Sequence, residues 1–98
     1  MKQYVIIAQD GRDAAAPGRR MENRPAHLAG ARKLKEMGSF ITGGAILDDD
    51  GTMRGSVMIV QFETEDGLKA WMSEEPYIVN GVWTDIQVKP FRVAEVEV

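Results

Sequence analysis

The fold is decided by the stretch SFITGGAILDDDGTMRGSVMIVQFE, residues 39–63. It contains two runs rich in β-branched and aromatic residues, 39–47 and 53–63, which favour strands. Between them, Asp50-Gly51 is a frequent two-residue hairpin turn. The three consecutive aspartates lack the spaced ligands of a calcium loop. We therefore interpret the stretch as a β-hairpin whose turn is formed by the DDDGT segment.

The second of these runs carries apolar residues on both faces, because successive side chains of a strand point to opposite sides of its sheet. Such strands are typical of sheets that are covered on both sides. In the first run, TGGA at 42–45 predicts a bulge, a close approach of a ligand to the backbone, or tight packing against a helix. One face of the second run holds Ser56, Met58, Val60 and Phe62, and the other holds Val57 and Ile59.

Upstream of the hairpin the pattern predicts a strand, a loop and a helix. QYVIIAQ, residues 3–9, is a strand-like run. Residues 10–20, DGRDAAAPGRR, contain structure-breaking residues and predict a loop. The helix then runs up to Gly38, its C-terminal capping residue. Two starts fit: Pro25, which suits a first turn, or a looser turn that reaches back to Gly18.

Downstream of the hairpin the pattern predicts a second helix and a last strand. Thr64 is a favourable N-cap for the helix, and Pro76 ends it. The last strand is GVWTDIQVKPFRV, residues 81–93. The buried stripe of the helix follows the i, i+3, i+4 spacing and consists of Leu68, Trp71 and Met72.

The element order is β-α-β-β-α-β, which predicts an α+β fold of the ferredoxin-like type with a four-stranded antiparallel sheet. No linker or repeat divides the 98 residues, so we expect a single domain over 1–98. Two helices on one face leave the other face of the sheet open, and an exposed apolar sheet favours association with a second copy. We therefore expect a homodimer joined through the open sheet face. That face would carry Val5, Ile7, Val57 and Ile59, with Trp83 as a further candidate.

Composition restricts the kinds of partner. The net charge of -3 and the pI near 5.1 disfavour nucleic acid, because phosphate binding relies on concentrated Lys and Arg. The apolar runs are far shorter than the roughly 20 residues of a membrane span, and the N-terminus has no signal-peptide pattern. The chain has no cysteine, which fits a reducing compartment. We therefore expect a cytoplasmic protein whose partners include no nucleic acid and no membrane.

Motifs for bound groups are missing as well. The sequence has no GxGxxG or P-loop pattern and no Ser/His/Asp signature. One histidine and no cysteine disfavour a metal site, so we expect neither a metal nor a cofactor. One local cluster of positive charge fits either a solvated loop or a rim that attracts an anionic ligand, and it consists of Arg12, Arg19, Arg20 and Arg24.

The single histidine, His27, lies in NRPAHLAGARKLKEMG, residues 23–38. At about 100° per residue, it shares a narrow apolar sector of the helix with Ala31 and Leu34. If the helix starts near Pro25, its positive end and partial burial both favour the neutral ring. A neutral imidazole can serve as a general base. The alternative is a core histidine bonded to a backbone carbonyl, and the pattern leaves both interpretations open.

A catalytic histidine usually has a partner that orients its ring. Glu75 is one candidate, because the following Pro76 forces an extended backbone that redirects the side chain away from the exposed helix face. Asp85 on the last strand is a competing candidate. The alternative for Glu75 is a solvated carboxylate at the end of a helix.

Taken together, these features resemble the YciI-like (YCII-related) family, and the resemblance covers nearly the whole chain. It implies a dimeric α+β barrel of the ferredoxin-like type. The family is similar to muconolactone isomerase and to a dehydrochlorinase that acts on chlorinated hydroxyquinols. The matching segments are YVIIAQD at 4–10, R-x-x-HL at 24–28, GG at 43–44, GSVMIVQFE at 55–63 and EPYIVNGVWTDIQVKPF at 75–91.

The resemblance also implies a catalytic pair formed by a histidine and an aspartate. The histidine falls on His27. The aspartate of the family's usual Asp-Pro-Tyr falls on Glu75, so this chain has an acid that is longer by one methylene. Ala45 stands where the family often has proline. Whether the pair is kept with altered geometry or lost is left open by the sequence.

The resulting hypothesis is a small cofactor-independent enzyme of the lyase or isomerase type. His27 would transfer a proton next to a carbonyl or phenol of a small cyclic substrate, and Glu75 would hold the tautomer of its ring. Arg24 would bind an acidic group of the substrate, and Ser56 and Tyr77 would offer hydroxyls to the same cleft. The alternatives are a non-catalytic homodimer that binds a small ligand and a purely structural dimerisation module.

Overall fold

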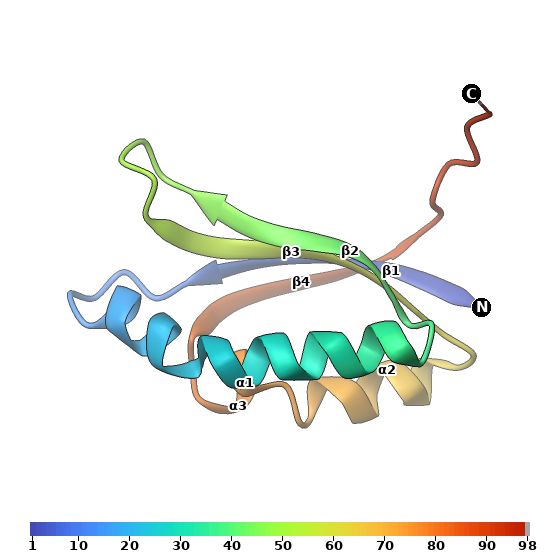
Figure 1. Cartoon of the computed structure of the whole chain (residues 1–98), viewed down its shortest axis with the longest axis horizontal. Helices are drawn as coiled ribbons and strands as arrows, with labels where there is room; N and C mark the ends of the chain where they lie inside the picture. The colour runs from blue at the N-terminus through green and yellow to red at the C-terminus, as the bar shows by residue number, and fades with distance from the viewer. Residues whose placement is uncertain (98) are drawn as a thin grey trace.

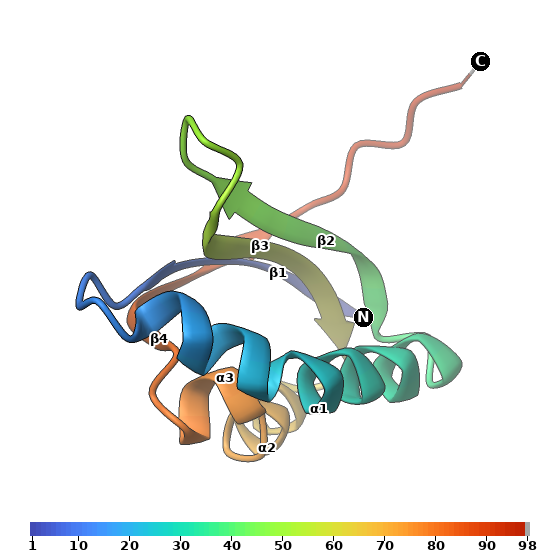
Figure 2. The same ribbon diagram turned by 60° about the vertical axis from the view of Figure 1, so that its left-hand side comes forward.

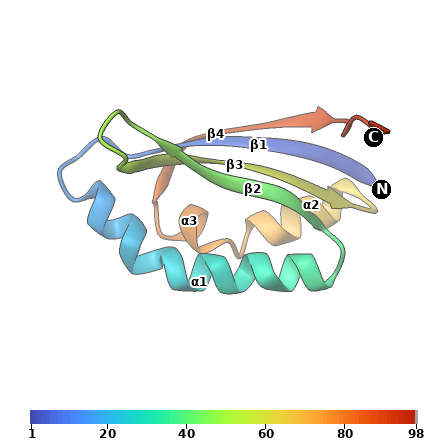
Figure 3. The ribbon, with the colours of Figure 1, turned by 45° about the horizontal axis from the view of Figure 1, so that its top comes forward.

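The computed structural model describes residues 1–97. Its four strands form one antiparallel sheet in the order β2-β3-β1-β4, and the helices all lie on one face of that sheet (Figures 1 and 3). This is the ferredoxin-like α+β arrangement that the element order predicts. Along the chain the elements are β1 (Lys2–Asp10), α1 (Ala16–Glu36), β2 (Phe40–Leu47), β3 (Met53–Phe62), α2 (Glu65–Met72), α3 (Pro76–Val79) and β4 (Trp83–Phe91).

The core lies between the sheet and the helices. Alternate residues of β1 and β3 point toward the helices, as the period of two requires, and Val60 and Ile6 are fully enclosed there. Leu34 of α1 and Leu68 of α2 cover them. The helix-facing residues of the two central strands are Tyr4, Ile6, Ala8 and Asp10 in β1 and Ser56, Met58, Val60 and Phe62 in β3.

The predicted turns and caps are confirmed. Gly38 after α1 and Gly51 in the hairpin both adopt positive φ, at 77° and 85°, which L side chains rarely tolerate. Asp48 uses its carboxylate to accept backbone N–H groups of the turn, including that of Thr52, so the DDD segment is a turn. Thr64 has an extended backbone and its hydroxyl accepts the N–H of Gly67.

The first helix starts earlier than Pro25 and two residues before Gly18, the two starts that the sequence left open. Residues 10–20 were expected to form a loop, with the helix starting near Pro25 or Gly18, but α1 begins at Ala16 and runs through Pro25 without a break. Pro17 falls in the first turn, where a missing N–H costs nothing. Pro25 is exposed, so the carbonyl of Met21, which loses its helical partner, lies on the solvent side of α1.

The expected end of the second helix also needs correction. Helix α2 ends at Met72, and Pro76 begins a separate short helix, α3, instead of closing the previous one. Glu75 is the N-cap of α3 and has the extended backbone that its position before a proline predicts, with φ −65° and ψ 119°. This extra turn is what carries Glu75 and Tyr77 inward.

A bulge between β1 and β4 places Trp83 on the face opposite to the one suggested by simple alternation. Gln9 pairs with Asp85, whereas the next residue of β1, Asp10, pairs with Trp83. The additional residue on β4, Thr84, shifts the phase of the strand. As a result Trp83 is 3% exposed and packs under the helices, and it is not part of the open face.

The open face carries the other predicted residues. Val5 pairs with Ile59 and Ile7 with Val57 at its centre, and all four are half-buried. After β4, residues 92–97 extend away from the sheet on the side opposite the helices (Figure 2). In the described part of the chain, no helix is long and apolar enough to cross a membrane.

Candidate functional site

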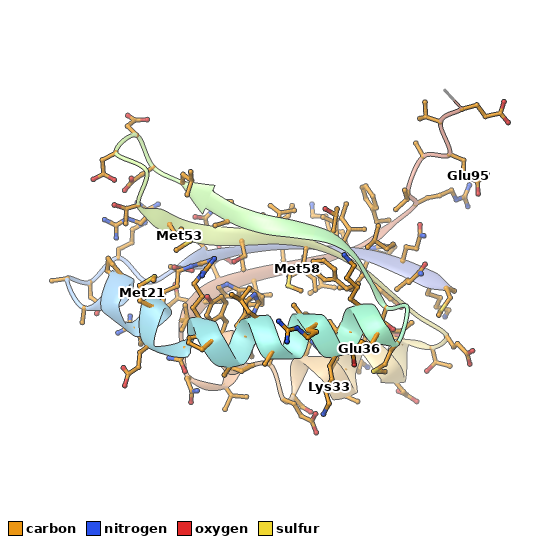
Figure 4. The ribbon with its side chains drawn as sticks, in the orientation of Figure 1. Met21, Lys33, Glu36, Met53, Met58 and Glu95 are labelled. Atoms are coloured by element: carbon orange, nitrogen blue, oxygen red, sulfur yellow. The ribbon has the colours of Figure 1, made fainter. Side chains whose placement is uncertain are left out.

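A cleft of about 210 Å³ lies between α1 and the strands β2 and β3. Figure 4 shows Met58 of β3 in the space between the sheet and α1, while Lys33 and Glu36 of α1 point away from the sheet. The glycines of the TGGA segment form part of the cleft's β2 wall. The lining residues are Arg20, Arg24, His27, Leu28, Ala31, Phe40, Gly43, Gly44, Ala45, Met53, Ser56, Met58 and Tyr77.

Four of the five predicted site residues line this cleft, and the fifth, Glu75, lies directly behind His27. The carboxylate Oε1 of Glu75 is 2.5 Å from Nδ1 of His27. Glu75 is only 2% exposed, so the interpretation of this residue as a solvated carboxylate is wrong. The competing acid, Asp85, is exposed and pairs with Gln9 on the open face, away from the histidine.

His27 owes its position to the long helix. It lies in the middle of α1 and not in a first turn, so the expected effect of the helix dipole on its ring does not apply. The residue is 9% exposed and its ring lines the cleft. Nδ1 faces Glu75, while Nε2 makes no hydrogen bond to residues 1–97. The ring is therefore anchored on one side and open to the cleft on the other.

The partner of Nδ1 fixes the tautomer of the neutral ring. Oε1 of Glu75 also accepts the backbone N–H of Tyr77 at 3.1 Å, which is how Glu75 caps α3. A carboxylate accepts hydrogen bonds and donates none when ionised. Nδ1 of His27 therefore carries the proton, and the lone pair lies on Nε2, which is the arrangement of a general base.

Aromatic rings hold the imidazole in place. The ring of Tyr77 stacks on that of His27 with centroids 3.9 Å apart and an angle of 10° between the planes. Trp83 meets His27 edge-on, with centroids 5.9 Å apart. The guanidinium of Arg20 also lies over the ring of Tyr77, 4.8 Å from its centroid. The histidine therefore has little freedom to change its rotamer.

A buried ion pair lies next to these rings. Nη1 of Arg20 donates to both carboxylate oxygens of Asp10, at 3.0 and 3.1 Å. Nη2 of Arg20 donates to Oγ of Ser56 at 3.0 Å, and Nε1 of Trp83 donates to the same oxygen at 3.2 Å. Within residues 1–97, Ser56 is thus part of a polar network that links β1, α1, β3 and β4.

Arg24 and Tyr77 both line the cleft, and each has a polar group without a partner in residues 1–97. Arg24 is half-buried and forms no ion pair with residues 1–97. Tyr77 is fully buried, and its hydroxyl has no hydrogen-bond partner in the described part of the chain. Burial raises the pKa of the Tyr77 phenol, with Arg20 and Arg24 acting in the opposite direction.

Three residues of this network were not predicted as site residues from the sequence. Asp10 was not considered, and Arg20 was named only as a member of a cluster of positive charge. Trp83 was a candidate for the open face of the sheet. The missing signal was the true start of α1. Arg20 and His27 are seven residues apart, which is two helical turns and therefore one face, but this applies only if the helix already includes residue 20. Asp10 follows Tyr4, Ile6 and Ala8 at the two-residue spacing of the strand, so it also faces the helices.

A second groove lies away from His27. This larger open groove of about 810 Å³ lies between α1 and α2, but apart from Glu75 its titratable residues are Lys33 and Glu74, both exposed. Within residues 1–97 there is no group of three or more His, Cys, Asp or Glu residues that could hold a metal ion.

The sequence profile of the YCII-related domain matches residues 2–92. The chain belongs to the YCII-related family. This YCII-related protein is 37% identical over 95 residues to Protein YciI of Escherichia coli O6:H1, which covers 91% of this chain and 95% of the relative. An uncharacterized protein of Haemophilus influenzae is 35% identical over 95 residues, with the same shares of the two chains.

Solved structures share the fold of this YCII-related protein. The 5-chloro-2-hydroxyhydroquinone dehydrochlorinase of Burkholderia phenoliruptrix, in complex with 2,5-dihydroxybenzoquinone, superposes with a TM-score of 0.78 at 26% identity, covering 94% of this chain and 95% of the enzyme. A dimeric ferredoxin-like protein of unknown function from Jannaschia superposes with a TM-score of 0.59 at 15% identity, covering 95% and 100% of the two chains. The second similarity concerns the fold alone.

Proposed function

We propose that this YCII-related protein is a small cofactor-independent enzyme of the lyase or isomerase type that moves a proton on a small cyclic substrate. The observation that carries the proposal is the contact between Nδ1 of His27 and the buried carboxylate of Glu75. That contact leaves Nε2 as the basic atom, and the ring borders a cleft. A positioned proton-transfer group of this kind contributes about 10²–10⁴-fold in rate.

The size and charge of the cleft support a small anionic or easily ionised substrate. Its volume of about 210 Å³ is below the range of about 300–1,000 Å³ that is usual for drug-sized ligands, so a single ring fits better than a larger molecule. Arg24 lines the cleft without an ion-pair partner in residues 1–97. The dehydrochlorinase similar to this chain holds a one-ring dihydroxyquinone, which supports the same ligand class.

In the proposed reaction, Nε2 of His27 takes a proton from a hydroxyl or from a carbon next to a carbonyl. The imidazolium that forms lies against the carboxylate of Glu75, which stabilises its charge. The proton then returns to a different atom of the substrate, which gives an isomer, or a leaving group departs with its electron pair, which gives an elimination. Both outcomes balance without an oxidant or a reductant.

Hydrogen exchange tests this proposal without knowledge of the natural product. The protein is incubated in D₂O with hydroxyquinones and cyclic enols, starting with 5-chloro-2-hydroxyhydroquinone, and NMR follows the replacement of carbon-bound hydrogen by deuterium together with chloride release. His27→Gln should remove the catalysed rate while the circular dichroism spectrum stays unchanged. Lys33→Gln, on the outer side of the same helix, should leave the rate unaltered. A folded His27→Gln variant with full activity would contradict the assignment.

The alternative is a non-catalytic protein that binds a small ligand in the same cleft. The unused groups of Arg24 and Tyr77 would suit that function equally well. Ligands that bind and shift the NMR signal of His27, but exchange no hydrogen at any concentration, would favour this alternative.

We also propose that the chain acts as one unit over residues 1–98 and associates as a homodimer through the open sheet face. The half-buried apolar residues at the centre of that face support the dimer, because an uncovered apolar sheet favours association. The dimeric ferredoxin-like neighbour has the same fold. Because the chain has no cysteine, we propose a reducing, cytoplasmic location.

A further inference from the structure

Three buried polar side chains form a continuous path from β1 to the wall of the cleft. Asp10, Arg20 and Ser56 are 4%, 4% and 3% exposed. Asp10 accepts two hydrogen bonds from Nη1 of Arg20, and Nη2 of Arg20 donates to Oγ of Ser56. The charge of Arg20 is neutralised by Asp10, so its second nitrogen is held in place as a donor toward the serine.

The hydrogen bonds around Ser56 fix the direction of its hydroxyl proton. Oγ accepts from Nη2 of Arg20 and also from Nε1 of Trp83, and both of these groups can only donate. A serine hydroxyl has two lone pairs and one proton, so the two contacts occupy both lone pairs. The proton is the only hydrogen-bonding capacity left to Ser56, and it donates to none of residues 1–97.

We propose that Ser56 is a fixed hydrogen-bond donor that binds an acceptor oxygen of the ligand in the cleft. This inference rests on the function proposed above, because it uses the same cleft, and it makes the substrate class more specific. The ligand would present a carbonyl, enolate or phenolate oxygen to Ser56. Arg24, which lines the same cleft, adds positive charge beside that oxygen. Arg20 is a positioning residue, since it acts on the ligand through Ser56.

A fixed donor can stabilise the negative charge that forms on a carbonyl oxygen when a proton is removed from the neighbouring carbon. When Nε2 of His27 removes the proton, the C–H bond breaks, a C=C bond forms, and the electron pair of the carbonyl moves onto its oxygen. Preorganised donors stabilise such a developing oxyanion. Ser56 cannot accept a hydrogen bond in this arrangement, so a ligand with an N–H or ammonium group at the same position would leave two donors facing each other.

Two coloured probes of equal shape test this donor directly. The phenolate of 4-nitrophenol presents an acceptor oxygen, whereas 4-nitroaniline presents an amino group, and absorbance titration gives both dissociation constants at mildly alkaline pH. The wild-type protein should bind the phenolate more tightly than the aniline. In Ser56→Ala the phenolate affinity should fall by about tenfold to a hundredfold, which is the range for a hydrogen bond to a charged group. The aniline affinity should change little.

Matched variants keep the test independent of folding. Ser73→Ala removes the same hydroxyl from an exposed position and should leave both affinities unchanged. Trp83→Phe removes one of the two donors to Ser56, so the hydroxyl regains a lone pair, and the preference for phenolate over aniline should narrow although Ser56 is still present. Circular dichroism checks that each variant is folded.

The results separate this inference from the proposed reaction. His27→Gln should keep the preference for phenolate, because the base is not the donor. If the wild-type protein binds neither probe, or binds both equally, or if Ser56→Ala retains the preference, the donor assignment is wrong. The hydrogen-exchange experiment on His27 tests the proposed reaction independently of these results.

Discussion

Oε1 of Glu75 lies 2.5 Å from Nδ1 of His27, although the two residues are 48 positions apart in the chain. The same oxygen caps α3 through the N–H of Tyr77. The acid that orients the imidazole is therefore fixed by the backbone of a helix, and not by a long flexible side chain alone. The cap of α3 and the orientation of the His27 ring therefore depend on the same carboxylate.

The rate of catalysed hydrogen exchange should depend on the negative charge of residue 75 more than on the length of its side chain. Glu75→Gln keeps an acceptor oxygen for the cap but loses the negative charge that stabilises the imidazolium, so catalysed hydrogen exchange should fall by about 10²-fold or more. Glu75→Asp retains the charge and a favourable N-cap, and it should keep part of the rate. Glu74→Gln, at the exposed neighbouring position, is the control. Equal rates in wild type and Glu75→Gln would refute the pair.

Replacing Asp10 should destabilise the fold strongly. Asp10→Asn leaves the buried guanidinium of Arg20 without its counter-charge, and breaking a buried pair in this way typically costs about 3–5 kcal/mol. Asp13→Asn removes the partner of Arg19, an exposed pair, and should have little effect. Urea unfolding of both variants measures the difference. Similar midpoints for the two variants would show that the buried pair contributes no more than the exposed one.

The combined change Asp10→Asn with Arg20→Met should recover part of the lost stability. The buried charge is then removed together with its partner, and apolar replacements of buried pairs are often tolerated. The recovery should not extend to phenolate binding, because Ser56 no longer receives the donor that fixes its hydroxyl. A double-mutant cycle over the four proteins measures the coupling.

Tyr77→Phe should make the free energy of unfolding less dependent on pH in the alkaline range. Burial raises the pKa of the folded Tyr77 phenol, whereas the unfolded phenol ionises at about pH 10. A raised pKa stabilises the folded state below that pH, and the contribution is lost as the pH rises through the folded value. The variant has no phenol to ionise, so its unfolding free energy should fall less steeply above pH 10.

At neutral pH the same variant should be as stable as the wild type or more stable. The hydroxyl of Tyr77 has no partner in residues 1–97, and a buried unsatisfied hydroxyl costs about 1–3 kcal/mol. Thermal unfolding at pH 7 and above pH 10 provides both measurements. A large loss of stability at neutral pH would indicate that the hydroxyl has a partner in solution.

A charge on the open sheet face should separate the proposed dimer. Val57→Lys and Ile59→Lys place an ammonium group at the centre of the apolar patch, where a second copy would have to desolvate it. Light scattering should give the mass of a dimer for the wild type and of a monomer for these variants. Val79→Lys, at a position that is 60% exposed on α3, should remain dimeric. A monomeric wild type at micromolar concentration would contradict the interface.

The topology followed from local patterns. The hairpin turn, the N-cap at Thr64 and the alternation in β3 are determined by neighbouring residues, and each is confirmed. The start of α1 was missed because two prolines, Pro17 and Pro25, are strong local breakers. The helix nevertheless passes through both, since one lies in its first turn and the other on its exposed side.

The site was only partly predictable, because its contacts depend on helix boundaries that the sequence pattern did not define. His27 and Glu75 were named as a candidate pair, but their contact depends on α3, a single turn that the sequence pattern did not distinguish from the end of α2. The pairing of Asp10 with Arg20 depends on the part of α1 that precedes Pro25 and on a strand that faces this part of the helix. Such contacts arise between distant elements and have no local signature.

The bulge at Thr84 makes the length of the last strand as important as its composition. With Thr84 in the bulge, Trp83 pairs with Asp10 and shares its helix-facing side. If the same residues paired in strict alternation, the indole would lie on the open face and Ser56 would lose one of its two donors. One unpaired residue in β4 thus decides which side of the sheet receives the indole.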